Sequence, residues 1–163
     1  MPPPSEPSPP ELALYGRSSS HYTRLVRLFA HEAGLSLPLV PVHDLRDPDA
    51  AAYGGHPALK LPVLAEGAAR LFGAETICRR LRALAPAPDR LILPEHLADP
   101  DFANAQEVIW SAMQAQVQLA FGIEVARLPA DNVYFAKART GLQGSLDWLG
   151  DRWPGLEARL PPL

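Results

Sequence analysis

Apolar and polar residues follow two different periods along the first half of the chain. The apolar run Leu12-Ala13-Leu14-Tyr15, closed by Gly16, predicts a short buried strand. From Tyr22 to Ala33 the apolar residues recur three and four positions apart, which predicts an amphipathic helix that ends at Gly34. Leu37 to Val42 predicts a second strand, and its two prolines place that strand at a sheet edge.

The same half continues with a short helix, a hairpin and a further helix. The short helix is expected over Asp47 to Tyr53. The runs Leu61–Ala65 and Ala69–Phe72 flank Glu66-Gly67-Ala68, which is typical of a β-hairpin. Ile77 to Leu84 then carries its apolar residues on one helical face. The predicted order is therefore β-α-β-α-β-β-α, which describes a small α/β domain.

Prolines divide the chain into three parts. Residues 2–10 hold six of the 19 prolines and almost nothing apolar, so residues 1–10 are expected to form a disordered tail. A second proline cluster, from Pro86 to Pro100, separates two differently patterned halves. We therefore expect an α/β domain over residues 11–86 and a short helical domain over residues 87–163.

Beyond Pro100 the pattern predicts only helices. One is expected from Phe102 to Phe121 and a second from Asp131 to Trp153, and each has an apolar face. A hairpin of two helices would leave large apolar side chains uncovered, among them Trp110, Met113, Phe121 and Trp148. We expect these side chains to pack against the α/β domain or against a second subunit.

Composition and charge narrow the range of functions. The net charge of −3 with no basic block argues against nucleic acid as a partner. No apolar run reaches membrane-spanning length and no signal peptide opens the sequence, so a cytoplasmic protein is expected. The single cysteine, Cys78, excludes an internal disulfide and is interpreted as an inert helix residue. The five histidines lack the spacing of metal ligands, so no metal site is predicted.

The segment from His56 to Leu64 places a proline at the start of the third predicted strand. Proline cannot donate to a sheet ladder, but it is tolerated at the first residue of a strand. If the Leu61–Pro62 peptide bond is cis, the Leu61 backbone is left unpaired and faces outward. Because unpaired backbone groups beside a cleft suit a peptide-like ligand, the segment predicts a thioredoxin-like fold with a peptide or thiol site.

With these segments in order, residues 12–84 resemble the glutathione S-transferase superfamily, and residues 101–153 resemble it in their helical pattern. The resemblance implies a thioredoxin-like α/β domain followed by an all-α helical hairpin, shorter than the family's usual helical domain. It also implies glutathione as co-substrate, a small-molecule electrophile as second substrate, and a homodimer. The matching segments are Leu14-Tyr15-Gly16, Ser20 with Val26-Arg27, Glu32-Ala33-Gly34-Leu35, His56-Pro57-x-x-Lys60-Leu61-Pro62-Val63-Leu64 (with histidine where the family usually carries asparagine) and Ile77-Cys78-Arg79-Arg80-Leu81.

The same resemblance implies a catalytic role for Ser20, whose hydroxyl would donate a hydrogen bond to the glutathione sulfur. The thiolate is the reactive form of a thiol, and a free pKa of about 8.5 leaves little of it at neutral pH. A hydroxyl donor together with the positive end of a helix dipole would lower that pKa. Tyr15, Ser18 and Ser19 are alternative donors, and a purely structural role of Ser20 as a helix N-cap is the other interpretation.

Further glutathione-binding positions are implied around the third strand. Lys60 is expected to pair with the glycyl carboxylate, although a solvated lysine beside a strand is the alternative. Leu61 and Pro62 would hold the peptide through the main chain. Family members usually place an acidic or amide residue followed by serine where this chain has Gly73-Ala74. Here the Ala74 backbone N–H is expected to hold a carboxylate, with Glu75 as the nearby acidic group.

Two functions of different classes follow from these residues. In the first, the chain is a small glutathione transferase that conjugates the glutathione thiolate to an electrophile. In the second, it is a catalytically degenerate module that keeps the fold for binding or dimerisation. A glutaredoxin-like reductase is disfavoured, because no cysteine occupies residues 20–23.

Overall fold

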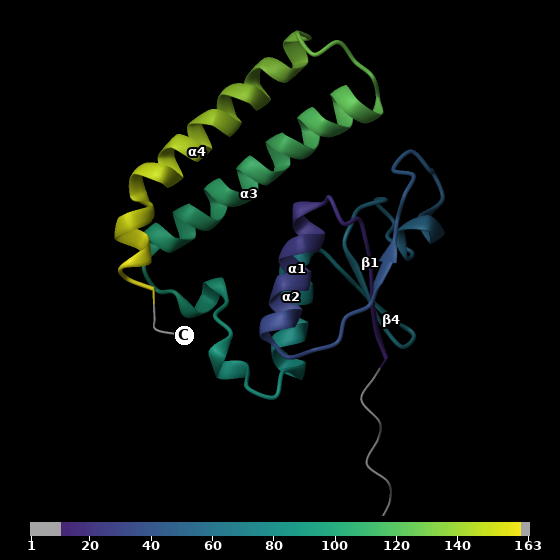
Figure 1. Ribbon diagram of the computed structural model, residues 1–163, viewed down its shortest axis with the longest axis vertical. Helices are drawn as coiled ribbons and strands as arrows, with labels where there is room; N and C mark the ends of the chain where they lie inside the picture. Colours follow the sequence, from purple (N-terminus) through teal and green to yellow (C-terminus); the bar gives the residue numbers. More distant parts are fainter. Residues whose placement is uncertain (1–10, 161–163) are drawn as a thin grey trace, which may run out of the picture. The chain divides into compact units, whose positions relative to one another are not determined.

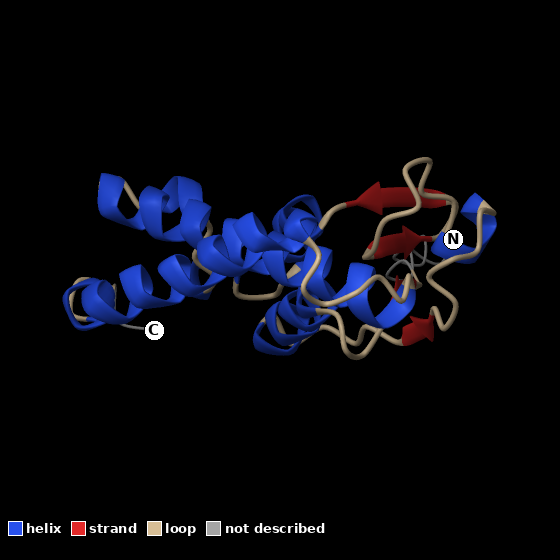
Figure 2. Cartoon of the chain, turned by 90° about the horizontal axis from the view of Figure 1, so that it is seen from above, coloured by secondary structure: helices blue, strands red, loops and turns tan. Residues whose placement is uncertain are grey.

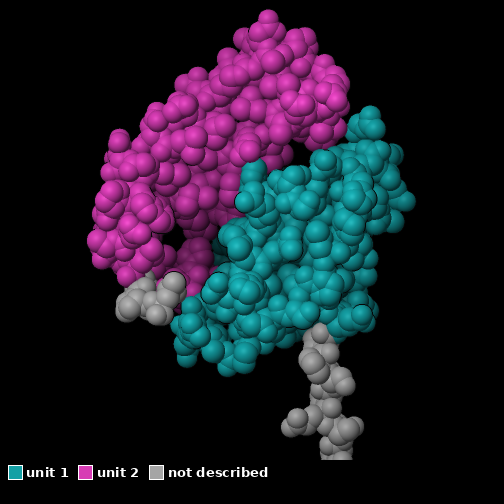
Figure 3. Space-filling view, viewed as in Figure 1, with its two compact units in different colours: residues 1–91 teal, residues 92–163 magenta. Residues whose placement is uncertain are grey.

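The computed structural model describes residues 11–160, so the predicted tail at residues 1–10 lies outside the described residues. The chain divides into two compact units between Leu91 and Ile92, a few residues after the boundary expected from the prolines (Figure 3). Unit 1 combines a sheet with helices, and unit 2 is helical in its described residues (Figure 2).

Unit 1 is built on a four-stranded sheet with the order β2-β1-β3-β4. β1 pairs in parallel with β2 and antiparallel with β3, and β3 forms an antiparallel hairpin with β4. β2 therefore lies at the sheet edge, as its prolines predicted, and the thioredoxin-like strand arrangement is confirmed. The strands are β1 (Leu12–Gly16), β2 (Leu39–Pro41), β3 (Val63–Glu66) and β4 (Ala69–Phe72).

Two helices, α1 (His21–Glu32) and α2 (Ala74–Leu84), pack against each other on one side of this sheet (Figure 1). Their contact is apolar because Val26 and Ile77 are fully buried, as are Leu14 and Leu64, which face each other on β1 and β3. The helical periodicity thus predicted most of the buried positions, although Leu25, expected on the apolar face of α1, is 38% exposed.

Several predicted boundaries in unit 1 are wrong. The second strand, expected over Leu37 to Val42, spans only Leu39–Pro41. The third strand begins at Val63 rather than Leu61, because a proline at position 62 cannot donate to the ladder. The last helix begins at Ala74, three residues before Ile77. The expected short helix over Asp47 to Tyr53 is a single 3₁₀ turn, η1 (Ala50–Tyr53), which starts where the Asp49 carboxylate accepts the Ala51 N–H at 2.9 Å.

Unit 2 is a hairpin of two long helices that pack along each other. Its second helix begins later than predicted, because the Asn132 side chain accepts the Tyr134 N–H at 2.9 Å and caps a 3₁₀ turn first. That helix also runs past Trp153 and through Pro154. The elements are α3 (Pro100–Ala120), the π-helical η4 (Phe121–Val125), η5 (Val133–Phe135) and α4 (Ala136–Glu157), and the linking 3₁₀ turns are η2 (Pro88–Arg90) and η3 (Pro94–His96).

The large apolar residues of α3 do not form the buried face of unit 2. Ile109 and Val117 are 41% and 43% exposed, while the small Ala105 and Ala112 are buried. Small residues let the two helix backbones approach closely. Of the four side chains expected to be uncovered in a hairpin, Phe121 is 42% exposed, whereas Trp110, Met113 and Trp148 are half-buried.

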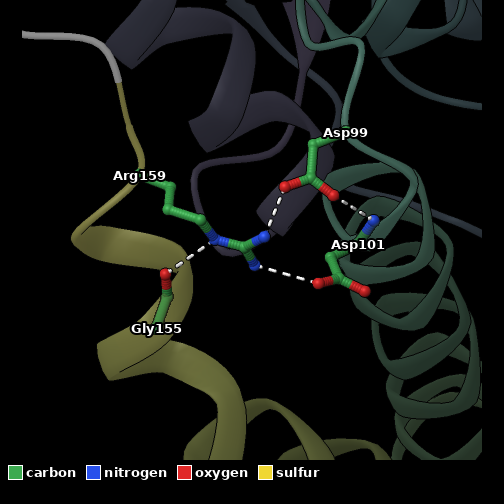
Figure 4. Close-up of polar contacts among 4 residues, drawn as sticks. All are labelled: Asp99, Asp101, Gly155 and Arg159. Carbon is green, nitrogen blue, oxygen red and sulfur yellow. Dashed lines mark hydrogen bonds and ion pairs between the residues drawn. The ribbon is translucent and has the colours of Figure 1, made fainter.

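An ion-pair cluster closes the end of the hairpin at which α3 starts and α4 ends (Figure 4). The Arg159 guanidinium pairs with Asp99 and, at 3.0 Å, with Asp101. It also donates to the Gly155 carbonyl at 3.0 Å. Asp99 in turn accepts the Asp101 N–H at 2.9 Å and is the N-cap of α3. One arginine thus fixes both helix ends.

Within residues 11–160, no helix is long and apolar enough to cross a membrane.

Candidate functional site

Strand directions in unit 1 bring three chain segments to one edge of the sheet. This edge is the one formed by the strand ends, where β1 finishes and β3 begins, and it is not the side edge formed by β2. β1 runs towards this edge and leads into the start of α1. β3 is antiparallel to β1 and begins here, with Val63 opposite Tyr15. β4 is antiparallel to β3 and ends here, with Phe72 opposite Val63, before α2 begins. The starts of α1 and α2 therefore lie at the same edge as Leu61 and Pro62.

Ser20 occupies the N-cap of α1. Its Oγ accepts the Thr23 N–H at 3.4 Å, its own N–H donates to the Arg17 carbonyl at 3.0 Å, and its side chain is half-buried. The expected N-cap role is therefore observed. Because the hydroxyl oxygen accepts this bond, its hydrogen is left to donate to another group. A structural and a chemical role are thus compatible at this residue.

Gly16 and Thr23 hold the start of α1 against β1, a contact that the sequence pattern did not indicate. A Cβ at Gly16 would lie 2.5 Å from the Thr23 side chain, so only glycine fits there. Thr23 is fully buried, and its Oγ1 accepts the Arg17 N–H at 3.3 Å. A glycine at the end of a buried strand is the signal that could have indicated such a close approach.

Arg17 fixes the loop that joins β1 to α1. Its guanidinium donates to Ser19 Oγ at 3.0 Å and to the His43 carbonyl at 2.8 Å. Ser19 is therefore bound to Arg17, and Ser18 is exposed. Of the three consecutive serines, Ser20 is the one whose side chain caps the helix.

The Leu61 backbone lies at the same edge with no partner in the sheet. The Leu61–Pro62 peptide bond is cis. Arg17, which follows β1, directs its N–H to Thr23 instead of across to the neighbouring strand. Within residues 11–160, no hydrogen bond uses the Leu61 N–H or C=O. The Leu61 N–H, a donor, and the Leu61 C=O, an acceptor, are thus both available to a ligand at this edge.

A tight turn at residues 56–59 precedes Lys60 and Leu61. The Ala58 N–H donates to His56 Nδ1 at 3.0 Å, and the Leu59 N–H donates to the His56 carbonyl at 3.0 Å. Leu59 has a φ of 53°, which is rare for a residue with a branched side chain. Lys60 is exposed and has no hydrogen-bond or ion-pair partner within the described residues. The turn determines how the chain enters the Leu61–Pro62 segment.

The His56 ring packs on the last residue of β4. Its centroid lies 4.5 Å from that of the Phe72 ring, and the two planes are tilted by 46°. Burial lowers the pKa of His56 below its usual value, and the nearby Lys60 charge lowers it further. The imidazole is therefore neutral at pH 7, with Nδ1 as an acceptor.

α2 begins without a side-chain cap. Its N-cap is Gly73, which has a φ of 82° and donates its own N–H to the Pro62 carbonyl at 3.4 Å. Ala74 is the first helical residue and is buried, and Glu75 pairs with Arg79 at 2.6 Å. The first N–H groups of a helix have no acceptor inside it, so they are available to an anion.

Other chemistry-bearing residues in unit 1 are not part of this edge. Burial raises the pKa of the Cys78 thiol to about 12, in keeping with an inert helix residue. Glu66 accepts two hydrogen bonds from Arg80, which lower the pKa of its carboxyl and tie α2 to the end of β3. Among residues 11–160, no group of histidine, cysteine or acidic side chains could hold a metal ion.

The comparisons with known proteins agree with this arrangement. Residues 14–89 match the family model described as "Glutathione S-transferase, N-terminal domain". That range begins in β1, ends just after α2 and contains every residue of the candidate site. No curated protein sequence is significantly similar to the chain.

Several solved structures share the fold. A glutathione S-transferase from Methylobacillus flagellatus KT, solved with glutathione bound, has a TM-score of 0.67 and 24% identity, over 85% of this chain and 68% of that one. A theta-class enzyme from Xanthomonas axonopodis pv. citri, also with glutathione bound, has a TM-score of 0.60 and 23% identity, over 91% and 71%. One from Methylobacterium radiotolerans, in complex with glutathione sulfonate, has a TM-score of 0.67 and 24% identity, over 85% and 65%.

Proposed function

We propose that this chain, whose residues 14–89 match the glutathione S-transferase N-terminal domain, binds glutathione at this sheet edge and conjugates it to a small electrophile. One observation carries the proposal: the Ser20 hydroxyl, the unpaired Leu61 backbone and the start of α2 lie at the same edge. Each suits a different part of a short peptide thiol. The relatives from M. flagellatus and X. axonopodis were solved with glutathione bound, which supports the choice of ligand.

Ser20 is the proposed catalytic residue. Its hydroxyl hydrogen would donate to the glutathione sulfur, and the start of α1 adds the positive end of the helix dipole. Both interactions favour the thiolate over the thiol and so lower the thiol pKa. The thiol proton passes to solvent, and the thiolate sulfur then attacks the electrophilic carbon to form a carbon–sulfur bond. The electron pair of the broken bond leaves with the displaced group or, in an addition, stays on the acceptor, which takes a proton from solvent.

Leu61, Pro62 and Lys60 would hold the central and glycyl parts of glutathione. The Leu61 N–H and C=O can pair with the peptide groups of the ligand in the manner of an added strand. The exposed Lys60 ammonium, which has no partner within the described residues, can pair with the glycyl carboxylate.

Because the reaction requires a reduced thiol, we place the protein in the cytoplasm, where thiols stay reduced.

Ala74 and Glu75 would hold the γ-glutamyl end. The Ala74 N–H lies at the start of α2 and can donate to the α-carboxylate. Glu75 lies in the first turn and can accept from the α-ammonium group while it remains paired with Arg79. The γ-glutamyl end would therefore be bound through one backbone N–H and one carboxylate, without a serine hydroxyl.

A second candidate function is supported by the same helix start. A chain that keeps the fold but has lost catalysis would serve as a binding or dimerisation module. The observation that favours it is the glycine N-cap of α2, which makes no side-chain hydrogen bond, followed by the buried Ala74. Fewer side-chain contacts to a ligand would reduce its affinity.

We further propose a homodimer, as is common in this family. Within unit 2, Ile109 and Val117 expose large apolar side chains along α3. Burying such a surface against a second copy would stabilise the association. Light scattering on the intact protein should give twice the mass of one chain, and the mass of a single chain at micromolar concentration would contradict this proposal.

Calorimetric titration with glutathione tests the proposed enzyme directly. We expect saturable binding in the millimolar range or tighter, followed by conjugation of a general test electrophile. No heat of binding at millimolar glutathione would refute the enzyme. Binding without conjugation of any electrophile in a panel would favour the degenerate module instead.

A further inference from the structure

His56 connects the turn that leads into Leu61 with the strand end that leads into α2. On one side, Nδ1 accepts the Ala58 N–H at 3.0 Å and the His56 carbonyl accepts the Leu59 N–H at 3.0 Å. On the other side, the ring packs on Phe72 at a centroid distance of 4.5 Å. Phe72 immediately precedes Gly73, whose N–H donates to the Pro62 carbonyl. One side chain therefore contacts both segments that border the Leu61–Pro62 position.

The Ala58 hydrogen bond requires a neutral imidazole. Nδ1 accepts a hydrogen bond only while it carries no proton, and in imidazolium both ring nitrogens are donors. Protonation of Nδ1 would therefore place two N–H donors opposite each other and break the hydrogen bond from the Ala58 N–H. The turn is also strained at Leu59, with a φ of 53°, so it depends on such hydrogen bonds to persist.

We propose that His56 is a positioning residue whose neutral ring holds the turn at residues 56–59 in its glutathione-binding form and whose protonation releases it. This inference rests on the proposed function for its effect on binding. Release of the turn would displace Lys60 and the Leu61 backbone, which are the expected contacts of the glycyl and central parts of glutathione. Glutathione binding should therefore weaken at acid pH.

The surroundings of His56 fix the direction of the effect. Lys60, on the same segment, is the charged group that acts on the imidazole, and it disfavours a second positive charge. The strand packed against the ring contributes Phe72, and the Arg70 guanidinium on that strand donates to the Gly67 and Ala69 carbonyls. Burial and Lys60 both lower the pKa of His56. The turn is therefore intact above the ordinary histidine pKa of about 6.5 and is lost as the pH falls through the lower folded value.

An asparagine at position 56 would keep the hydrogen bond from the Ala58 N–H but would have no group that titrates. Asn Oδ1 can accept the N–H two residues on, in an Asx-turn, as His56 Nδ1 does here, and it does not titrate. His56→Asn should therefore keep the turn at every pH, and His56→Leu should lose it at every pH. His31→Asn, on the exposed surface of α1, is the matched control.

Calorimetric titration with glutathione at pH 7 and pH 5 tests the inference. The parent protein and His31→Asn should bind about fivefold more weakly at pH 5, the effect of one lost hydrogen bond. His56→Asn should lose about fivefold less affinity than the parent between the two pH values, because any effect of the bound thiol is shared by both proteins. An equal loss in the parent and in His56→Asn would overturn the inference and assign the pH effect to another group.

A second measurement is independent of glutathione. In nuclear magnetic resonance spectra of the free protein, the Ala58 amide signal should move with the His56 titration in the parent and stay constant in His56→Asn. An Ala58 amide chemical shift that stays constant while His56 titrates would overturn the inference. If glutathione binds at neither pH, the proposed function fails, and the Ala58 signal still decides whether the histidine controls the turn.

Discussion

The two helices of unit 1 begin at the same sheet edge, but their first residues differ. α1 begins after Ser20, whose hydroxyl caps the helix and accepts the Thr23 N–H. α2 begins after Gly73, which has no side chain and makes no cap of this kind. Both helix starts attract negative charge through their free N–H groups. Only α1 adds a hydroxyl that can donate to a sulfur atom.

This difference separates the chemistry of the site from its anchoring. The start of α1 carries the group that would change the pKa of a thiol. The start of α2 offers backbone N–H groups and Glu75, which would hold the far end of the ligand. We therefore expect substitutions at α1 to change reactivity and substitutions at α2 to change affinity or stability.

The largest expected effect comes from giving α2 the side chain that Gly73 lacks. With a φ of 82°, Gly73 lies in the left-handed region, where a residue with a Cβ is strained. Gly73→Gln should lower the free energy of unfolding by about 2 kcal/mol, as measured by chemical denaturation. Ala83→Gln, on the exposed face of the same helix, should change it by less than about 0.5 kcal/mol. Equal effects of the two variants would show that the Gly73 backbone does not require glycine.

The next largest effect is expected at the start of α1. Ser20→Ala should reduce conjugation of a test electrophile about 10-fold, or about 1.4 kcal/mol, through loss of thiolate stabilisation. Ser20→Gly should lose the same activity while it keeps most of the helix-capping stability. Ser18→Ala is the matched control, because Ser18 is exposed and Ser20 is not. Full activity of Ser20→Ala would transfer the role to Tyr15, Ser18 or Ser19.

A smaller gain is expected when α2 receives a hydroxyl. Ala74→Ser places a hydroxyl on the first residue of the helix, where it can donate to the γ-glutamyl carboxylate. One added hydrogen bond should tighten glutathione binding about fivefold in calorimetry. Thr76→Ser, an exposed change in the same turn, should leave binding as it is. An unchanged affinity of Ala74→Ser would place the γ-glutamyl end elsewhere.

The order of elements in unit 1 could be predicted from the sequence because each has a distinct local signal. β1 is an apolar run stopped by Gly16, and α1 has a helical period that leaves Val26 fully buried. The edge position of β2 followed from its prolines. These are short-range properties, so they can be read without the tertiary structure.

Properties that the hydrophobic period does not contain were missed. The periodicity of α3 placed Ile109 and Val117 on one face, but it did not show that Ala105 and Ala112 make the buried contact. The capping of η5 by Asn132 displaced the start of α4 from the predicted position. In both cases the choice is made by packing or by a side-chain hydrogen bond, which periodicity does not contain.

The residues of the candidate site stay a prediction from the sequence, and the contacts that support them were not predicted. Ser20, Lys60, Leu61, Pro62, Ala74 and Glu75 were expected from the sequence, and the strand directions bring the segments that carry them to one edge. The close contact of Gly16 with Thr23 and the link from His56 to Phe72 were not foreseen. Both join residues that are separated in the sequence and come together only in the fold.

The most direct test of the account is a pH titration of protein-bound glutathione, followed by the ultraviolet absorbance of the thiolate. If Ser20 and the start of α1 stabilise the anion, the bound thiol should titrate at least about one unit below its free pKa of about 8.5. In Ser20→Ala the midpoint should return towards the free value. A bound thiol that titrates like free glutathione, or a midpoint that Ser20→Ala leaves unchanged, would contradict the central claim.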